Sequence, residues 1–265
     1  MVAVKQQHPD LLLATKGMNI RVDTLDALRR TGIRTAVWFP DNAAREPYAS
    51  WVRTVGSRWD HFFSFDSAIY DQMPTASHER VHVLPFGIDP AAYQLETLTP
   101  KDHARFDCDI CLIGAAYPDR IRLLEQVKDL NVKVWGWSGW RATSLRAQYH
   151  GPLDARESAR AYRCAKICLN TNILPHAHGL NLKTFEIAAA GGFQLTDRLP
   201  DLDASFVIGK ELDVFTDERD FRRKVQYWLA HNDLRQAIAA AGRERALKDH
   251  ALRQRMHGML TTIFP

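Results

Sequence analysis

The stretch His176-Ala-His-Gly-Leu-Asn-Leu-Lys-Thr-Phe-Glu-Ile-Ala-Ala-Ala-Gly-Gly-Phe-Gln-Leu-Thr-Asp197 contains the clearest structural signal in the sequence. It predicts a helix over Leu182–Ala190, whose three final alanines allow close packing against a sheet. Gly191 and Gly192 end this helix, because glycine readily adopts the left-handed conformation found after a helix C-terminus. The apolar strand Phe193–Thr196 follows at once. A helix joined to a strand in this way is one unit of an α/β fold.

The same alternation of apolar strands and amphipathic helices extends along the rest of the chain. Strands alternating with helices predict parallel sheets covered on both faces. The other predicted strands are Pro9–Thr15, Ile33–Phe39, His61–Phe65, Val81–Pro85, Cys108–Gly114, Val132–Trp135, Lys166–Asn170 and Leu212–Phe215. The other predicted helices are Asp23–Thr31, Pro47–Val55, Ser67–Met73, Pro118–Leu130, Glu157–Ala165, Arg219–Leu229 and Leu234–Leu247, the last two forming a helical tail.

Residues 87–105 interrupt this alternation. They contain Gly87, Pro90 and Pro100 and show no clear period, which is typical of a linker. A chain of 265 residues is long enough for two domains of ordinary size. We therefore expect an N-terminal domain over residues 1–95 and a C-terminal domain over residues 96–265.

The composition excludes several classes of protein. Hydrophobic residues make up 46% and charged residues 25%, which is ordinary for a globular protein and excludes disorder, collagen and coiled coils. No apolar run is long enough for a membrane span, and the first ten residues lack the apolar segment of a signal peptide, so we expect a cytoplasmic protein. The net charge of +4 is too weak to indicate a nucleic-acid partner.

Four cysteines occur in two pairs, Cys108 with Cys111 and Cys164 with Cys168, and raise the question of a zinc site. Side chains three residues apart on a strand point to opposite faces, so the first pair cannot share a metal without breaking the predicted strand. The second pair lies where a helix runs into the next strand. We interpret all four as buried thiols and expect no metal.

The sequence lacks the motifs of several common enzyme classes. The dinucleotide fingerprint G-x-G-x-x-G is absent, because the turn Gly114–Arg120 contains a single glycine, and no Walker A or G-x-S-x-G motif occurs. Asp107-Cys-Asp109 has the D-x-D spelling of many metal-dependent sugar transferases. It precedes a strand, however, and ligands of open α/β sheets lie beyond the opposite, carboxyl ends. We interpret these acids as ordinary strand-edge residues.

The start of the predicted helix Leu182–Ala190 is suited to bind an anion. Asn181 can cap it, and Lys183 lies in the first turn, where free amides and the helix dipole favour negative charge. Gly179 lets the backbone approach a ligand closely. Glu186, one turn further on, can accept hydrogen bonds from sugar or ribose hydroxyls. Alternatively, Lys183 and Glu186 form a surface ion pair without a ligand, and the residues alone leave both interpretations open.

The carboxyl ends of the other predicted strands supply further candidates. Trp135, Trp137 and Trp140 flank glycines and either stack on a base or sugar or pack in the core. Polar or glycine candidates at these strand ends are Asp41 and Asp66 in the first half, and Gly114, Arg120, Asn170 and Asn172 in the second.

The order of these segments resembles one known family. The helix with Glu186, followed by small residues, glycine and a strand, resembles the signature of GT-B glycosyltransferases. It is especially similar to the "glycosyl transferases group 1" domain of the spore-maturation CgeB-like family. Further segments that resemble this family are Phe106–Arg120, Tyr162–Asn170, Phe221–Ala246 with His250, Pro9-Asp-Leu, Trp38-Phe-Pro-Asp41 and Leu84-Pro-Phe-Gly87.

The resemblance implies a fold and an activity. The fold would be α/β of the GT-B type, with two Rossmann-like parallel-sheet domains facing a cleft. The activity would be transfer of a sugar from a nucleotide-diphosphate donor to an acceptor (a protein, a polysaccharide or a small molecule), without a metal or other cofactor. The implied donor-binding residues are Gly114, Arg120, Asn170, Asn172, His178, Gly179, Asn181, Lys183, Thr184 and Glu186. Glu186 is also a catalytic candidate, and Asp41 is the candidate base of an inverting reaction or else a turn residue or helix cap. Arg120 is alternatively an exposed helix residue, and His176 and His178 are alternatively loop residues without a catalytic task.

Two features depart from the family pattern. Many retaining GT-B transferases carry a second glutamate eight positions before the one that matches Glu186, whereas this chain has His178 there, close to His176. Relatives also open with a glycine-rich strand–loop–helix, so we expect an N-terminal domain that is incomplete. The missing element supports one alternative, a non-catalytic nucleotide-sugar-binding or structural protein on the same scaffold. A further alternative is an enzyme of another class on two α/β domains, an epimerase or phosphorylase.

Overall fold

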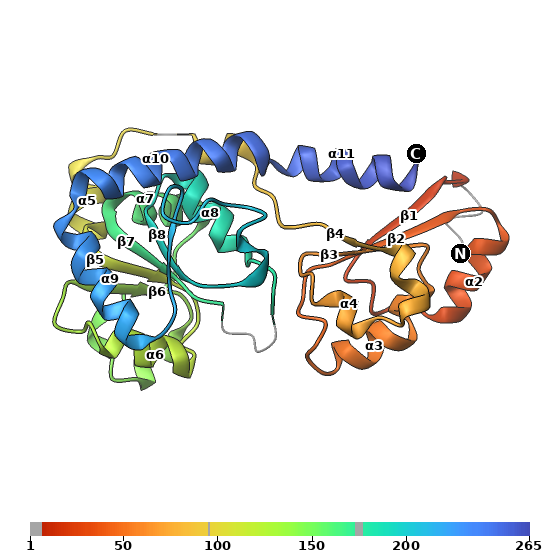
Figure 1. Ribbon diagram of the computed structural model, residues 1–265, viewed down its shortest axis with the longest axis horizontal. Helices are drawn as coiled ribbons and strands as arrows, with labels where there is room; N and C mark the ends of the chain where they lie inside the picture. The colour runs from red at the N-terminus through yellow and green to blue at the C-terminus, as the bar shows by residue number, and fades with distance from the viewer. Residues whose placement is uncertain (1–6, 95, 173–176) are drawn as a thin grey trace. The chain divides into compact units, whose positions relative to one another are not determined.

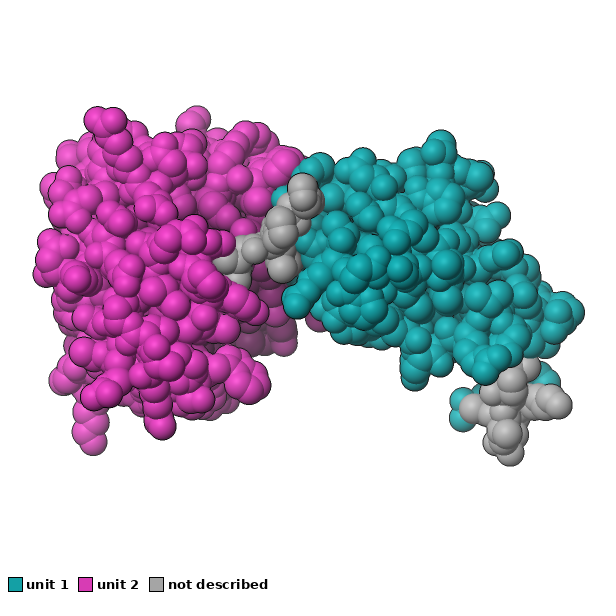
Figure 2. All heavy atoms as spheres, turned by 90° about the horizontal axis from the view of Figure 1, so that it is seen from below, with its two compact units in different colours: residues 1–86, 174–180, 255–265 teal, residues 87–173, 181–254 magenta. Residues whose placement is uncertain are grey.

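The computed structural model of the protein describes residues 7–94, 96–172 and 177–265 (Figure 1). Contacts divide the chain into two compact units, which Figure 2 colours separately. Unit 1 comprises the described residues of 1–86, 174–180 and 255–265, and unit 2 those of 87–173 and 181–254. Each unit contains one parallel sheet, so the predicted α/β class is confirmed. No helix in the described ranges combines the length and apolarity needed to cross a bilayer.

Unit 1 is built on a four-stranded sheet with the order β1-β2-β3-β4. One face packs against α2, α3 and α4 through Leu25, Val52 and Ile69. The other face is covered by the C-terminal helix α11, whose Met259 and Ile263 pack against β2 and β3. The elements are β1 (Leu11–Thr15), α2 (Val22–Arg30), β2 (Arg34–Phe39), α3 (Tyr48–Thr54), β3 (His61–Ser64), α4 (Ile69–Gln72), β4 (Val81–Val83) and α11 (Leu252–Ile263), which begins three residues before unit 1 resumes.

Unit 2 contains a five-stranded parallel sheet with the order β6-β5-β7-β8-β9. One face packs against α6 and α9 through Leu124 and Phe221. The other packs against α7 and α8 through Tyr162 and Ile187. The elements are α5 (Pro100–Phe106), β5 (Cys108–Ile113), α6 (Pro118–Glu125), β6 (Val132–Trp135), α7 (Ala155–Cys164), β7 (Ala165–Asn170), α8 (Leu182–Ala190), β8 (Gln194–Asp197), β9 (Asp213–Phe215), α9 (Glu218–Ala230) and α10 (Asn232–Asp249).

The strand order of unit 2 indicates where a ligand would bind. From β5 the chain passes to β6 on one side, and later to β7 on the other side of β5. Where the connections from two neighbouring strands run to opposite sides of a sheet, a crevice forms at the carboxyl ends of these two strands. Gly114 directly follows β5, and Asn170 is the last residue of β7. The switch point therefore lies beside these two predicted site residues.

The interpretation of residues 87–105 as a linker without a clear period is wrong in part, because the segment contains two helices. A 3₁₀ helix spans Pro90–Tyr93, and α5 begins at Pro100. The Thr99 hydroxyl accepts the Asp102 N–H at 3.2 Å, and the Asp102 carboxylate accepts the Thr99 N–H at 2.8 Å. This capping box satisfies two backbone N–H groups at the start of the helix. Proline also fits the first helical position, because its missing N–H is not needed there.

The cysteines form no disulfide. Cys108, Cys111 and Cys168 are buried, as expected, but Cys164 is only half-buried. The expectation that Cys108 and Cys111 are separated on opposite faces of the sheet is wrong, since both join the core cluster that contains Cys168. Burial raises the pKa of the Cys108 and Cys111 thiols, so these two behave as inert core side chains.

Candidate functional site

The start of α8 is fixed to the carboxyl end of β7 by polar side chains. Asn181 Oδ1 accepts the Thr184 N–H at 3.2 Å, which caps the helix. Asn170 Nδ2 donates to Asn181 Oδ1 at 3.2 Å and to Thr184 Oγ1 at 3.0 Å. Asn172 Oδ1 accepts the Asn181 N–H at 3.2 Å, and the Asn172 N–H donates to Asp197 Oδ1 at 3.0 Å. These side chains satisfy one another's hydrogen-bonding groups, and the resulting network holds the N-terminus of α8 in place.

Arg120 provides a buried positive charge beside this helix start. It lies in the first turn of α6 and is 6% exposed. Its Nε donates to Thr171 Oγ1 at 2.9 Å, its Nη2 to the Thr171 carbonyl at 3.1 Å and its Nη1 to the Ala115 carbonyl at 3.1 Å. Among the described residues, no carboxylate comes within 4.0 Å of the guanidinium, although the charge of Asp197 acts on it from further away. Gly114 is needed here, because a Cβ on it would lie 2.5 Å from Arg120 Nη1.

Lys183 and Glu186 are half-buried on α8, one turn apart. Burial and the positive charge of Arg120 lower the pKa of Lys183, while Glu186 acts in the opposite direction. Burial raises the pKa of Glu186, and Lys183 and a hydrogen bond donated by the Tyr93 hydroxyl oppose this rise. Lys183 makes no hydrogen bond or ion pair with any residue in the described ranges. Two neighbouring cations that form no ion pair within 4.0 Å among the described residues are typical of a site that receives an anion.

A cavity of about 670 Å³ opens next to Lys183, a size that suits a small-molecule ligand. Gly114 and Gly136 both line it and are in close backbone contact, since a Cβ on Gly136 would lie 2.4 Å from the Gly114 carbonyl oxygen. Trp137 is 81% exposed at its rim, so its ring is free to stack on a ligand. The cavity is lined by Ile113, Gly114, Gly136, Trp137, Ser138, Arg141, Tyr149, Pro152, Leu153 and Lys183.

The other two tryptophans have a different role. Trp135 and Trp140 are 1% and 0% exposed, so they belong to the core. Trp140 also donates its indole N–H to the Gly114 carbonyl at 2.8 Å. This hydrogen bond fixes the backbone of Gly114, which lines the cavity.

His178 and Gly179 were predicted to bind the donor, but their contacts lie within unit 1. Their backbone N–H groups donate to Asp66 Oδ1 at 3.0 and 3.1 Å. His178 Nδ1 is 3.1 Å from Ser67 Oγ. A Cβ on Gly179 would lie 2.6 Å from Asp66 Cα, so glycine is needed here for contact with the chain itself. His176 lies outside the described residues.

Asp41, the candidate base, follows β2 in unit 1. Its Oδ2 is 2.9 Å from Lys16 Nζ, which also donates to the Tyr48 hydroxyl at 2.9 Å. Lys16 has a φ of +65°, a left-handed conformation that is uncommon for lysine. Asp41 therefore belongs to a polar group at the carboxyl ends of β1 and β2, where ligands of parallel sheets bind.

Sequence reasoning missed Tyr93, Arg141 and Tyr149. Tyr93 lies in the segment interpreted as a linker, and the other two follow β6 in a stretch without a motif. Only the Trp-Gly spacing around Trp137 pointed to this part of the chain. Long-range packing, rather than local pattern, brings these side chains to the site.

The family model described as glycosyl transferase-like matches residues 120–261. This range begins at Arg120, inside α6, and includes α8 with Lys183 and Glu186. The chain belongs to this glycosyl transferase-like family. This glycosyl transferase-like chain is also 23% identical to spore protein CgeB of Bacillus subtilis (strain 168) over 263 residues, covering 91% of the chain and 78% of CgeB. The resemblance found in the sequence is thereby confirmed.

Solved structures show the same fold for this glycosyl transferase-like chain. Anabaena Alr3699/HepE in complex with UDP matches with a TM-score of 0.74 at 11% identity, covering 99% of this chain and 80% of that one. A glycosyltransferase from Rickettsia africae matches with a TM-score of 0.69 at 10% identity, covering 99% and 78%. Sucrose-phosphate synthase from Thermosynechococcus elongatus matches with a TM-score of 0.68 at 12% identity, covering 98% and 74%. The predicted GT-B fold is thus confirmed.

Proposed function

We propose that the chain transfers a sugar from a nucleotide-diphosphate donor to an acceptor, and that unit 2 binds the donor. The pair of cations Arg120 and Lys183 carries this proposal, because neither has a carboxylate within 4.0 Å among the described residues. Two like charges repel each other in partly buried surroundings, so an anion bound beside them would be stabilised. The free amides in the first turn of α8 add further donors for a diphosphate.

The same groups supply a chemical reason for catalysis. Negative charge builds up on the diphosphate as it leaves the sugar, and fixed positive groups lower the barrier by stabilising that charge. Arg120 and Lys183 would do this without a divalent metal, so we propose that sugar transfer is metal-independent. Glu186 would accept hydrogen bonds from donor hydroxyls while Tyr93 holds its carboxylate in place.

Two further assignments belong to this proposal. UDP-sugars are the first donors to test, because Anabaena Alr3699/HepE has been solved with UDP and with UDP-glucose. Asp41 is the proposed base if the reaction inverts. It would have to exchange its ion pair with Lys16 for a hydrogen bond from the acceptor hydroxyl.

Calorimetry with UDP- and GDP-sugars tests the site. We expect Lys183→Ala and Glu186→Ala each to weaken donor binding by at least about tenfold, the effect of losing one charge-assisted hydrogen bond. Lys210 is exposed on a loop, so Lys210→Ala is the matched control and should bind as the wild type does. Unchanged donor affinity in both site variants would overturn the assignment.

A donor-hydrolysis assay distinguishes the possible activities. Slow release of free sugar in the presence of a chelator is expected for a metal-independent transferase. Binding without any turnover, even with added acceptors, would instead support a non-catalytic protein. Conversion of the donor to an isomer without an acceptor would support an epimerase.

A further inference from the structure

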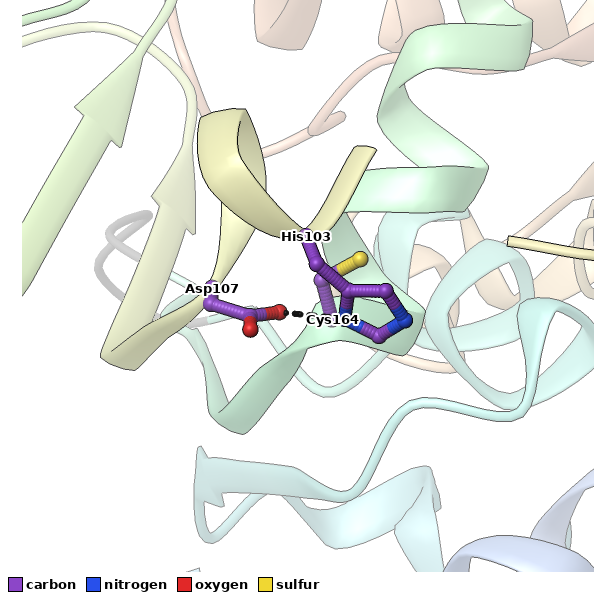
Figure 3. A group of neighbouring side chains, drawn as sticks. All are labelled: His103, Asp107 and Cys164. Carbon is purple, nitrogen blue, oxygen red and sulfur yellow. Dashed lines mark hydrogen bonds and ion pairs between the residues drawn. The ribbon is translucent and has the colours of Figure 1, made fainter. Parts of the chain in front are cut away.

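A second polar cluster lies at the amino ends of β5 and β7, whereas the proposed donor site lies at the carboxyl ends of these strands. Figure 3 shows its members: His103 on α5, Asp107 just before β5 and Cys164 at the end of α7. His103 Nδ1 is 2.9 Å from Asp107 Oδ1, and these two atoms and the Cys164 Sγ all lie within 4.8 Å of one another. We propose that these residues form a binding site for a divalent transition-metal ion of the Zn²⁺ type.

The ligand types favour zinc over magnesium or calcium. A thiolate and an imidazole are soft or borderline ligands, and Mg²⁺ and Ca²⁺ prefer oxygen alone. At zinc–ligand distances of roughly 2.0 to 2.3 Å, tetrahedral ligand atoms are about 3.4 Å apart. The three atoms are already within 4.8 Å, so small side-chain rotations would complete the geometry. Water would take the fourth position.

Local structure explains why these side chains converge. His103 and Asp107 are four residues apart, the spacing that places two side chains on one face of a helical turn. The capping box at Thr99 fixes where α5 begins and therefore which residues face α7. Both α5 and α7 end at the cluster, and the partial negative charge of a helix C-terminus favours a cation there.

The two helices are also held together without a metal. Arg105 Nη1 on α5 is 2.6 Å from Glu157 Oε1 on α7. Arg160 Nη1 on α7 is 3.8 Å from Asp102 Oδ1 on α5. These ion pairs link the two helices, so the three ligands lie on elements that already contact each other.

The arrangement does not fit a nucleophilic cysteine. In a catalytic triad the histidine lies between the nucleophile and the acid. Here the Asp107 carboxylate is the shared acceptor of hydrogen bonds from His103 and Cys164. Burial and the nearby Asp107 and Asp102 raise the pKa of the Cys164 thiol to about 11. A bound metal would displace the thiol proton to solvent and form a metal–sulfur bond.

Cobalt and zinc titrations of tag-free, full-length protein test the site. We expect one Co²⁺ per chain, with a near-ultraviolet thiolate-to-cobalt band and the intense visible bands of tetrahedral Co²⁺. Zn²⁺ should displace the Co²⁺ and raise the melting temperature, since the metal would join α5 to α7. Magnesium should do neither.

Three variants decide the outcome. Cys164→Ser should abolish the charge-transfer band, and His103→Ala should lower the Zn²⁺ affinity at least tenfold. His257, an exposed histidine of unit 1, supplies the control His257→Ala, which should bind as the wild type does. The absence of stoichiometric binding, or equal Zn²⁺ affinity in all three variants, would overturn the proposal. UDP-sugar affinity should stay unchanged in Cys164→Ser, so this test is independent of the proposed donor site.

Discussion

Asp66 offers the most direct test of how the segment before α8 is held. It is 2% exposed, and its Oδ1 accepts backbone N–H groups from Ala68 at 2.9 Å, His178 at 3.0 Å and Gly179 at 3.1 Å. The variant Asp66→Ala leaves these three donors without this acceptor. An unsatisfied buried donor costs about 1 to 3 kcal/mol. The lower value applies to each donor, because the variant also removes a carboxylate whose burial costs free energy. For three donors we therefore expect the unfolding free energy to fall by about 3 kcal/mol.

Urea unfolding, followed by tryptophan fluorescence and circular dichroism, measures this loss. Asp66→Asn keeps the Oδ1 acceptor and should lose less than half as much. Asp89 also accepts one backbone N–H, from Ala91 at 3.0 Å, but it is exposed, so Asp89→Ala controls for the loss of an ordinary turn contact. A loss below about 1 kcal/mol in Asp66→Ala would refute the reasoning. Donor affinity should also fall, because Gly179 lies two residues before the N-cap of α8.

Three further predictions concern titratable groups. Tyr93→Phe removes the hydrogen bond that lowers the pKa of Glu186, so the acid-side fall in donor affinity should move to higher pH in calorimetry; an unchanged pH profile would contradict the role given to Tyr93. Folding lowers the pKa of Lys183, so the unfolded chain binds the proton more tightly than the folded chain does. The unfolding free energy should therefore rise with pH between the lowered pKa and 10.5. Lys183→Met should flatten this rise when urea unfolding is measured across that pH range. Burial lowers the pKa of His61 and His82, whose rings stack with Nδ1 and Nε2 3.3 Å apart, so stability should be lost as pH falls below 6.5. His82→Gln should reduce that acid loss, and an equal loss in the variant would exclude the pair as its source.

The sequence was sufficient for features that depend on local pattern. The alternation of apolar strands and helices predicted every strand of both sheets, and the Asn181 cap with Gly191 predicted the limits of α8. The same cap also predicted that Lys183 lies in the first turn of α8, where an anion would be favoured. The helix α5 was missed although its signal, Thr99-Pro-Lys-Asp102, is present in the sequence.

Features that depend on distant contacts were not predictable. The N–H groups of His178 and Gly179 donate to Asp66, which is 112 and 113 residues away in the sequence. The residues around α8 contain no sign of this contact, and they suggested a donor-binding role instead. Tyr93 and Glu186 likewise come from separate segments that meet only in the folded unit. The domain boundary after residue 95 stays a prediction, as do the individual donor-binding residues.

The position of α11 has a consequence for synthesis on the ribosome. Ala36 on β2 and Phe63 on β3 are at most 1% exposed, and Met259 and Ile263 of α11 pack against their side of the sheet. The ribosome must therefore make the whole of unit 2 before α11 can close this half of the unit 1 core. A chaperone that shields nascent chains would find an apolar sheet face here while unit 2 is being made, and termination before α11 would leave that face open to aggregation.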